Sequence, residues 1–193
     1  LNVREGRKYK IGVDLAKLSD FTVITPIDLH TWCVGQIDRF QQIDYPMIEA
    51  RIEVAWRKYN KAKMQVEANS IGEPVIDHLL HDKGITNIDG VTLTERSREA
   101  MLKNLSVLLE TDQIKIPNNE QLIRELKAMR YERDEKTKKV KIISPIHDDC
   151  VLSLAHCVWQ LPRLPEIVHE SLESKEFRAV IKARQQTNVL KRI

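Results

Sequence analysis

The sequence lacks the segments that mark secreted or membrane-bound chains. No apolar run approaches the ~18 residues that a membrane-spanning helix needs. The first ten residues, LNVREGRKYK, have no apolar core of the kind found in signal peptides, and no initiator methionine stands at position 1. We therefore expect a chain that does not cross a membrane, and an excised or processed piece rather than a primary translation product.

Cysteine and glycine are both scarce. The three cysteines, Cys33, Cys150 and Cys157, are odd in number and form no CxxC pair, which favours a reducing compartment over a disulfide framework. The six glycines form no GxxxxGK[ST] phosphate loop. An ATPase motor is therefore not expected in this chain.

The composition suits one folded domain with an appendage. Of the 193 residues, 42% are hydrophobic and 31% are charged. Residues 1–162 carry 24 basic and 24 acidic side chains, whereas residues 163–193 carry seven basic and four acidic ones. We expect a domain over 1–162 and a basic C-terminal tail over 163–193, peripheral or partly helical. Such a tail either meets nucleic acid or an acidic partner, or is simply solvated.

Hydrophobic periodicity predicts a mixed α/β fold. In YKIGVDLAK the apolar side chains alternate from Tyr9 to Leu15, which is typical of a strand, and two further strands up to Phe40 complete a meander. Helical and strand patterns then follow one another, with helices expected over 45–60, 71–84, 97–112 and 118–130, strands over 63–68, 88–94 and 113–117, a β-hairpin over 131–143 and a last core helix after Asp149. This order favours a mixed sheet covered by helices.

Asp14 is unusual because it lies inside a predicted strand, where aspartate is disfavoured. Its neighbours on the same face, Gly12 and Ala16, are small, and we expect them to leave space above the carboxylate for ions and a substrate backbone. A buried aspartate that is hydrogen-bonded to a loop is the alternative.

Further carboxylates stand at element ends. Glu67 closes a predicted strand, and ligand sites in open α/β sheets favour that end. Asp148 and Asp149 open the last helix, where one carboxylate is explained as a cap. The second is harder to explain, because adjacent like charges repel and raise a pKa. A divalent cation would hold both ionised.

All-oxygen ligands favour Mg²⁺ or Mn²⁺. A zinc site from His147, Cys150, His156 and Cys157 is disfavoured, because His147 and His156 would not share one helix face; buried apolar cysteines explain the pattern better. His147 itself is better explained as a surface or cap-proximal residue than as a group beside a leaving group.

Three separated carboxylate-bearing elements fit two-metal phosphoryl chemistry. Basic side chains would then contact DNA phosphates, and the candidates are Lys17, Lys103, Lys136, Lys138, Lys139 and Lys141. For each of these lysines, an ordinary position on the solvated surface is an equally good explanation. No recognition helix or zinc finger is visible, so we expect little sequence specificity and a steep salt dependence.

Five segments resemble, in order and spacing, the nuclease domain of the large terminase subunit of tailed double-stranded DNA bacteriophages. They are GVDLAKLSDFTVI, VEANSIGEPVIDHL, TERSREAMLKNLSVLLETDQIKIPN, ELKAMRYERDEKTKKVKI and HDDCVLSLAHCVW, within about residues 8–160. The resemblance implies a ribonuclease H-like α/β fold, with a central five-stranded mixed sheet flanked by helices and an added β-hairpin. It also implies metal-dependent endonuclease activity on concatemeric viral DNA during genome packaging in the host cytoplasm, with the portal protein and small terminase subunit as partners.

The family's acidic cluster corresponds to Asp14, Glu67, Asp148 and Asp149, which would be both catalytic and metal-binding, with two Mg²⁺ or Mn²⁺ ions. Many members carry aspartate where this chain has Glu67. The family's charged hairpin corresponds to residues 130–143, which would regulate access or contact DNA. Two alternatives stay open: another ribonuclease H-like nuclease, such as a junction resolvase or transposase core, and a non-catalytic docking module that works through the basic tail.

Overall fold

The computed structural model describes residues 2–15, 20–69, 72–133, 135 and 140–161. Within these residues the chain forms seven strands and five helices. In chain order they are β1 (Tyr9–Asp14), β2 (Thr22–Asp28), β3 (Asp38–Phe40), α1 (Tyr45–Lys58), β4 (Lys63–Glu67), α2 (Gly72–His81), β5 (Ile88–Val91), α3 (Glu95–Glu110), α4 (Glu120–Ala128), β6 (Arg130–Arg133), β7 (Val140–Ile143) and α5 (Asp149–Val158). None of the described helices is long and apolar enough to cross a bilayer.

Five strands form one mixed sheet in the order β3-β2-β1-β4-β5. The first three strands pair antiparallel, as the predicted meander requires, while β1–β4 and β4–β5 pair in parallel. The predicted five-stranded mixed sheet flanked by helices is confirmed. The strands β6 and β7 pair antiparallel in a separate two-stranded sheet, which confirms the added hairpin.

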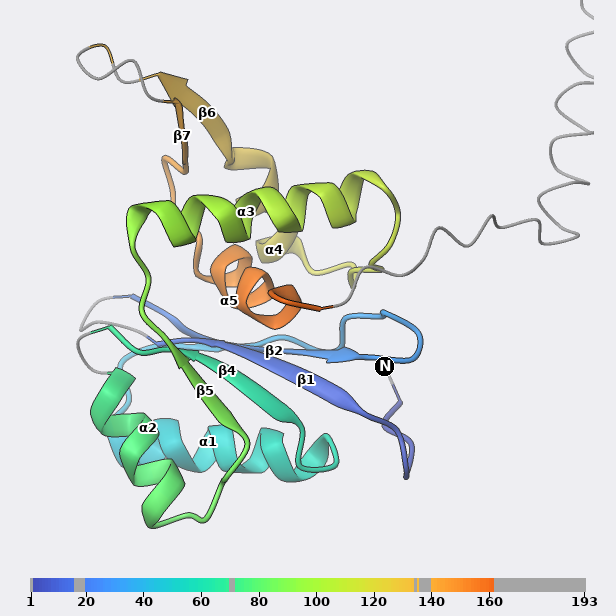
Figure 1. Ribbon diagram of the computed structural model, residues 1–193, viewed down its shortest axis with the longest axis vertical. Helices are drawn as coiled ribbons and strands as arrows, with labels where there is room; N and C mark the ends of the chain where they lie inside the picture. Colours follow the sequence, from blue (N-terminus) through green and yellow to red (C-terminus); the bar gives the residue numbers. More distant parts are fainter. Residues whose placement is uncertain (1, 16–19, 70–71, 134, 136–139, 162–193) are drawn as a thin grey trace, which may run out of the picture. The chain divides into compact units, whose positions relative to one another are not determined.

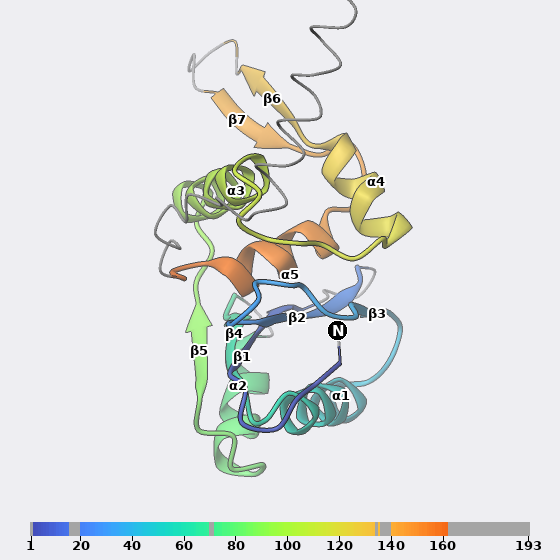
Figure 2. The ribbon, with the colours of Figure 1, turned by 90° about the vertical axis from the view of Figure 1, so that its right-hand side faces the viewer.

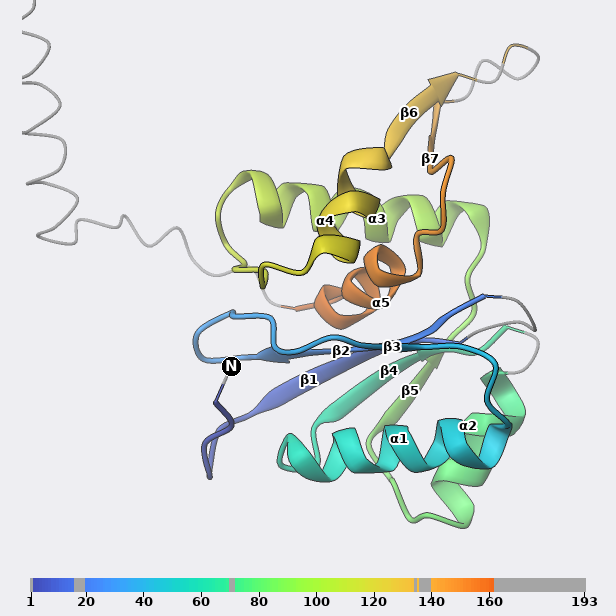
Figure 3. The same cartoon turned by 180° about the vertical axis from the view of Figure 1, so that it is seen from behind.

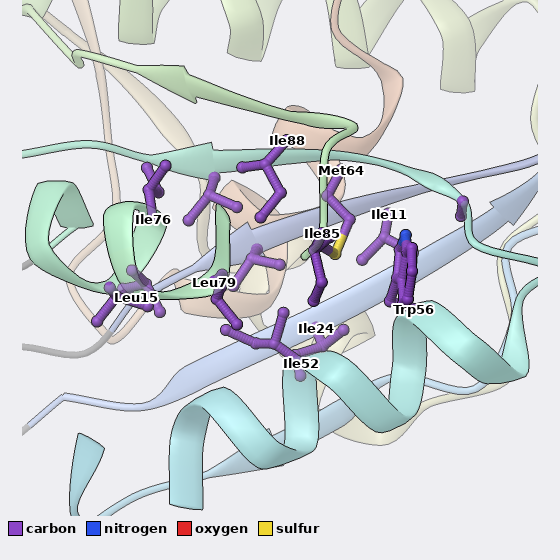
Figure 4. Packing of buried hydrophobic residues seen from close by; sticks show 14 of the residues in the cluster. Ile11, Leu15, Ile24, Ile52, Trp56, Met64, Ile76, Leu79, Ile85 and Ile88 are labelled. Carbon is purple, nitrogen blue, oxygen red and sulfur yellow. The ribbon is translucent and has the colours of Figure 1, made fainter. Parts of the chain in front are cut away.

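Helices α1 and α2 cover one face of the sheet (Figure 1). The core on this side joins apolar side chains of β1 and β4 to those of the two helices, with Ile11, Ile52, Met64 and Leu79 all fully buried (Figure 4). Asn87 accepts a hydrogen bond from the Trp56 indole at 2.8 Å, so this large side chain is buried with its polar atom satisfied.

Helix α5 packs on the opposite face, and α3 and α4 lie over it on the side away from the sheet (Figures 2 and 3). Gly12 permits this close approach, because a Cβ added there would collide with backbone atoms of Ser153 and Cys157. The Ser153 hydroxyl lies 3.0 Å from the carbonyl oxygens of both Gly12 and Val23. The space above Gly12 is therefore filled by helix α5, not kept for ions or substrate as the sequence pattern had led us to expect; Ala16 lies outside the described residues.

Two predicted strands differ from the observed elements. The third strand is only three residues long, because the chain before it touches β2 only at one bridge, between Ile27 and Val34. Residues 113–117 form no strand; Lys115 makes a single bridge to Cys33. Each of these two segments therefore forms one isolated bridge and not the continuous series of backbone hydrogen bonds that defines a strand. The helix expected over 97–112 begins slightly earlier, with Thr94 as its N-cap in a reciprocal pair with Ser97.

Candidate metal and nucleic-acid site

Asp14 and Glu67 lie side by side at the carboxyl ends of two inner strands of the sheet, β1 and β4. Each is the last residue of its strand, and the parallel register that pairs Val13 with Val66 brings the two strand ends together. Asp14 is only 5% exposed, whereas Glu67 is half-buried. The backbone of two adjacent parallel strands thus delivers two carboxylates to the same place, as expected for strand carboxyl ends.

The first turn of α5 brings Asp148 and Asp149 to these same strand ends. Together with Asp14 and Glu67 these residues line one cleft of about 540 Å³, whose remaining lining is Leu15, Asp20, Ser144, Pro145, Ile146, His147 and Leu152. The four predicted acidic residues are therefore neighbours around a shared cavity, although Asp14 and Asp149 are 135 positions apart along the chain.

The charges in this cleft perturb one another. Burial raises the pKa of Asp14 well above its usual value, and the charge of Glu67, a hydrogen bond with Glu67 and the charges of Asp149 and Asp148 raise it further. Burial also raises the pKa of Asp149 to about 6, followed by the negative charge of Glu125. The pKa of Asp149 is thus raised, as expected, but the main causes are burial and the charge of Glu125, and the adjacent Asp148 is not among them.

Arg98 on α3 compensates one of the charges. Its guanidinium forms an ion pair with Asp148 and donates a second hydrogen bond to the Ile142 carbonyl at 2.9 Å. Asp148 occupies the N-cap position of α5, yet its side chain makes no capping hydrogen bond. The interpretation of Asp148 as a simple helix cap is therefore wrong.

A second cationic group approaches Asp149 from the sheet. The Arg39 guanidinium carbon lies 3.1 Å from the Phe21 ring centroid, and Nη2 lies 3.8 Å from Asp149 Oδ2. His147 Nδ1 lies 3.8 Å from the same oxygen and 3.7 Å from Asp20 Oδ1. Sequence reasoning missed Asp20, Arg39 and Arg98, because nothing in their local patterns separates them from ordinary surface charges.

The donor set fits a hard divalent cation. All of the predicted ligands are carboxylates, and the buried Oδ2 of Asp149 has no hydrogen-bond partner. Within the described part of the chain, no three acidic, histidine or cysteine side chains are already arranged as a metal-binding group. The Asp148–Arg98 ion pair occupies a carboxylate oxygen that a cation could use.

The four residues of the disfavoured zinc site do not form a cluster. Cys150, His156 and Cys157 are buried within α5, whereas the His147 side chain is 53% exposed. Burial lowers the pKa of His156 to about 4 and raises that of Cys157 to about 12, so both side chains are neutral near pH 7. The buried cysteines predicted from the sequence are confirmed.

Only two of the six candidate DNA-binding lysines fall within the described residues. Lys103 on α3 pairs with Glu99 at 2.6 Å, and Lys141 on β7 pairs with Glu95. Neither lines the acidic cleft. Lys17, Lys136, Lys138 and Lys139 lie outside the described residues, as does the basic tail over 163–193.

Comparison with known proteins finds a family match over most of the chain. The family described as "Terminase RNaseH-like domain" matches residues 11–160. The large terminase subunit of Thermus phage G20c is 27% identical over 148 residues, which is 76% of this chain and 30% of that protein. The chain thus spans about a third of the curated relatives that it matches.

Solved structures agree in fold. The large terminase nuclease of the thermophilic phage G20c with bound magnesium has a TM-score of 0.75 and 27% identity, over 82% of this chain and 84% of that one. The large terminase nuclease domain of Thermus phage P74-26 has a TM-score of 0.73 and 25% identity, over 82% of each chain.

Proposed function

This chain belongs to the terminase family with a ribonuclease H-like domain, and on that premise we propose that it is a metal-dependent DNA endonuclease. The observation that carries the proposal is the cleft in which Asp14, Glu67, Asp148 and Asp149 converge from three elements. The similar nuclease of phage G20c has been solved with bound magnesium, which supports a divalent cation here.

We propose that these four carboxylates hold two Mg²⁺ or Mn²⁺ ions. Divalent cations bound there would supply Lewis-acid activation of water and neutralise charge on a phosphodiester. The described residues contribute the rest. Asp14 and Glu67 form a floor fixed by two paired strands, and α5 presents the other two carboxylates from its first turn. Arg98 forms an ion pair with Asp148 that a cation would have to displace, and Arg39 approaches Asp149 from the sheet.

The substrate that we propose is double-stranded DNA, read through its phosphates rather than its bases. Lys103 and Lys141, with the lysines at 17, 136, 138 and 139, are the proposed phosphate contacts. For Lys103 and Lys141 a phosphate has to compete with Glu99 and Glu95, respectively. Binding should consequently weaken steeply as salt rises.

Because the relatives are large terminase subunits, we further propose that the domain cuts concatemeric viral DNA during genome packaging. The portal protein and the small terminase subunit are the proposed partners, and the host cytoplasm the proposed location. The tail over 163–193 remains a candidate docking or DNA-binding segment.

Plasmid cleavage tests the proposal. The protein should nick and linearise supercoiled plasmid with Mn²⁺ or Mg²⁺, and EDTA or Asp14→Ala should abolish cutting. Cleavage by Asp14→Ala at the wild-type rate would show that the site is misplaced. A strong preference for four-way junctions over linear duplex would instead favour a junction resolvase. Retained cutting after deletion of residues 163–193 would separate the tail from catalysis.

A further inference from the structure

Glu125 on α4 makes contacts that bear on how α5 presents its aspartates. We propose that Glu125 is a positioning residue: it caps α5 from a neighbouring helix, and so leaves the carboxylates of Asp148 and Asp149 free to face the cleft. The inference rests on the proposed function in one respect, namely that these carboxylates bind metal.

The hydrogen bonds define the cap. The backbone N–H groups of Cys150 and Val151 donate to Glu125 Oε2 at 2.8 and 3.2 Å. These two residues are the second and third of the helix, whose N–H groups the side chain of the N-cap residue normally accepts. The N-cap residue here is Asp148, an excellent capping residue, and its side chain makes no such bond. Glu125 thus occupies the place that Asp148 would otherwise take.

The capping carboxylate is held by its own partners. Glu125 is fully buried, its Oε1 accepts a hydrogen bond from the Gln121 amide at 2.8 Å, and Arg39 Nε lies 4.0 Å from that oxygen. Burying a carboxylate is unfavourable even when it is paired. Capping by Asp148 would satisfy the same N–H groups without burying a second charge. Capping by Glu125 instead therefore has one specific consequence: the carboxylate of Asp148 is not used as a cap.

The freed carboxylates are where the proposed chemistry needs them. Asp148 turns to Arg98 at the cleft, and Asp149 keeps a buried oxygen without a hydrogen-bond partner. Without Glu125, the first turn of α5 would have two unsatisfied buried N–H groups, and the nearest alternative acceptor in sequence is the carboxylate of Asp148. Rotation of Asp148 into that place would withdraw a ligand from the cleft.

Direct Mn²⁺ titration by calorimetry, at a temperature where every variant is folded, separates positioning from simple support. Glu125→Ala should bind Mn²⁺ about 10- to 100-fold more weakly, the usual effect of losing a residue that orients a ligand. Glu125→Gln keeps an acceptor oxygen for the two N–H groups and should remain close to wild type. Leu122→Ala is the matched control, because it removes a fully buried side chain from the same helix face but leaves the cap. The inference is overturned if Glu125→Ala binds normally, or if Leu122→Ala loses as much affinity.

Amide hydrogen exchange at Val151 tests the cap without any metal. Val151 should stay protected in wild type, in Asp148→Ala and in Glu125→Ala, where Asp148 takes over, and should lose protection only in the double variant. Equal loss in Glu125→Ala and the double variant would contradict the inference. If wild type binds no Mn²⁺, the proposed function fails, and the exchange pattern still decides whether Glu125 keeps Asp148 from capping the helix.

Discussion

Asp14 and Glu67 end two adjacent parallel strands and line the same acidic cleft, where burial and then the charge of Glu67 raise the pKa of Asp14. The raised pKa means that Asp14 keeps its proton to a higher pH than an ordinary aspartate does, and a protonated Asp14 can donate a hydrogen bond to Glu67. On the proposed function, a divalent cation bound between the two carboxylates would replace that proton. This relationship makes stability, pH and metal binding interdependent.

The first prediction concerns Asp14→Asn in the presence of EDTA. The folded protein holds the Asp14 proton more tightly than the unfolded chain, so the stability that this proton contributes is complete below about pH 4 and is lost as pH rises towards the higher folded pKa. Asparagine keeps a donor for Glu67 at every pH. The variant should match wild type near pH 4 and exceed its free energy of unfolding by about 1–2 kcal/mol near pH 8. Urea denaturation measures the difference, and a gap that does not change with pH would refute the explanation.

The second prediction concerns the stabilisation of wild type by Mn²⁺. Binding must displace protons from Asp14 and from Asp149, whose pKa is about 6. The rise in Tm on adding Mn²⁺ should therefore be larger at pH 8 than at pH 5.5, and Asp14→Asn should lose most of it. Thermal melts with Mn²⁺ and with EDTA provide the measurement. An equal rise at both pH values, or in both proteins, would place Mn²⁺ somewhere else.

The third prediction concerns Arg98, which joins α3 to Asp148 and to β7. Arg98→Ala should lower the free energy of unfolding in EDTA by about 1–3 kcal/mol, because Asp148 loses a charge-assisted partner in a cleft that is already acidic. The same uncompensated charge should enlarge the stabilisation by Mn²⁺. Arg96→Ala, an exposed change on the same helix, is the control and should alter neither quantity. A smaller Mn²⁺ effect in Arg98→Ala would mean that the arginine supports metal binding instead of opposing it.

The fourth prediction concerns the packing of α5 on β1. Gly12→Ala places a methyl group against the backbone of Ser153 and Cys157, which cannot move aside as a side chain can. We expect a loss of about 3 kcal/mol in stability. Gly90→Ala is the matched control, since its methyl group would lie 3.1 Å from the flexible end of Ile76, and it should cost much less. Equal losses of stability for Gly12→Ala and Gly90→Ala in chemical denaturation would show that the fold does not require the close approach of α5 to β1.

The fifth prediction concerns DNA binding by Lys141. Lys141→Ala should reduce the slope of log K against log salt by about one, the value for one phosphate contact. Lys63→Ala is the control: Lys63 is exposed and ion-paired with Asp89 at 2.7 Å, but it begins β4 at the end opposite Glu67. Fluorescence anisotropy of labelled duplex with Ca²⁺ would supply the slopes. Equal slopes for Lys141→Ala and wild type would remove Lys141 from the interface.

Much of this architecture was predictable from sequence, for physical reasons. The sequence of the first strand alternates strictly, and a carboxylate in that pattern stands out, although the strand ends at Asp14 instead of continuing past it as predicted. Asp148 and Asp149 stand out because they stand at the start of an almost wholly apolar helix. Order and spacing along the chain then indicated that these segments belong to one fold, which the family match confirms.

The rest depends on contacts between distant segments. Glu125 belongs to an amphipathic helix, and its pattern does not reveal that a buried glutamate faces the N-terminus of α5. Arg98 similarly resembles any helix arginine until α3 and β7 meet beside Asp148. Residues 113–117 have a strand-like pattern, but they form only one bridge, between Lys115 and Cys33. The missing side chain of Gly12 suggested open space above the strand, because the sequence does not show that the backbone of α5 fills this space.

We propose above all that Asp14, Glu67, Asp148 and Asp149 form one metal site. Anomalous diffraction from crystals soaked in Mn²⁺ tests it most directly, because the signal locates the ions without assuming any activity. We expect one or two strong peaks in the cleft, with carboxylate oxygens of Asp14 and the α5 aspartates within about 2.0–2.5 Å. Strong peaks elsewhere, with none in contact with Asp14, would contradict it.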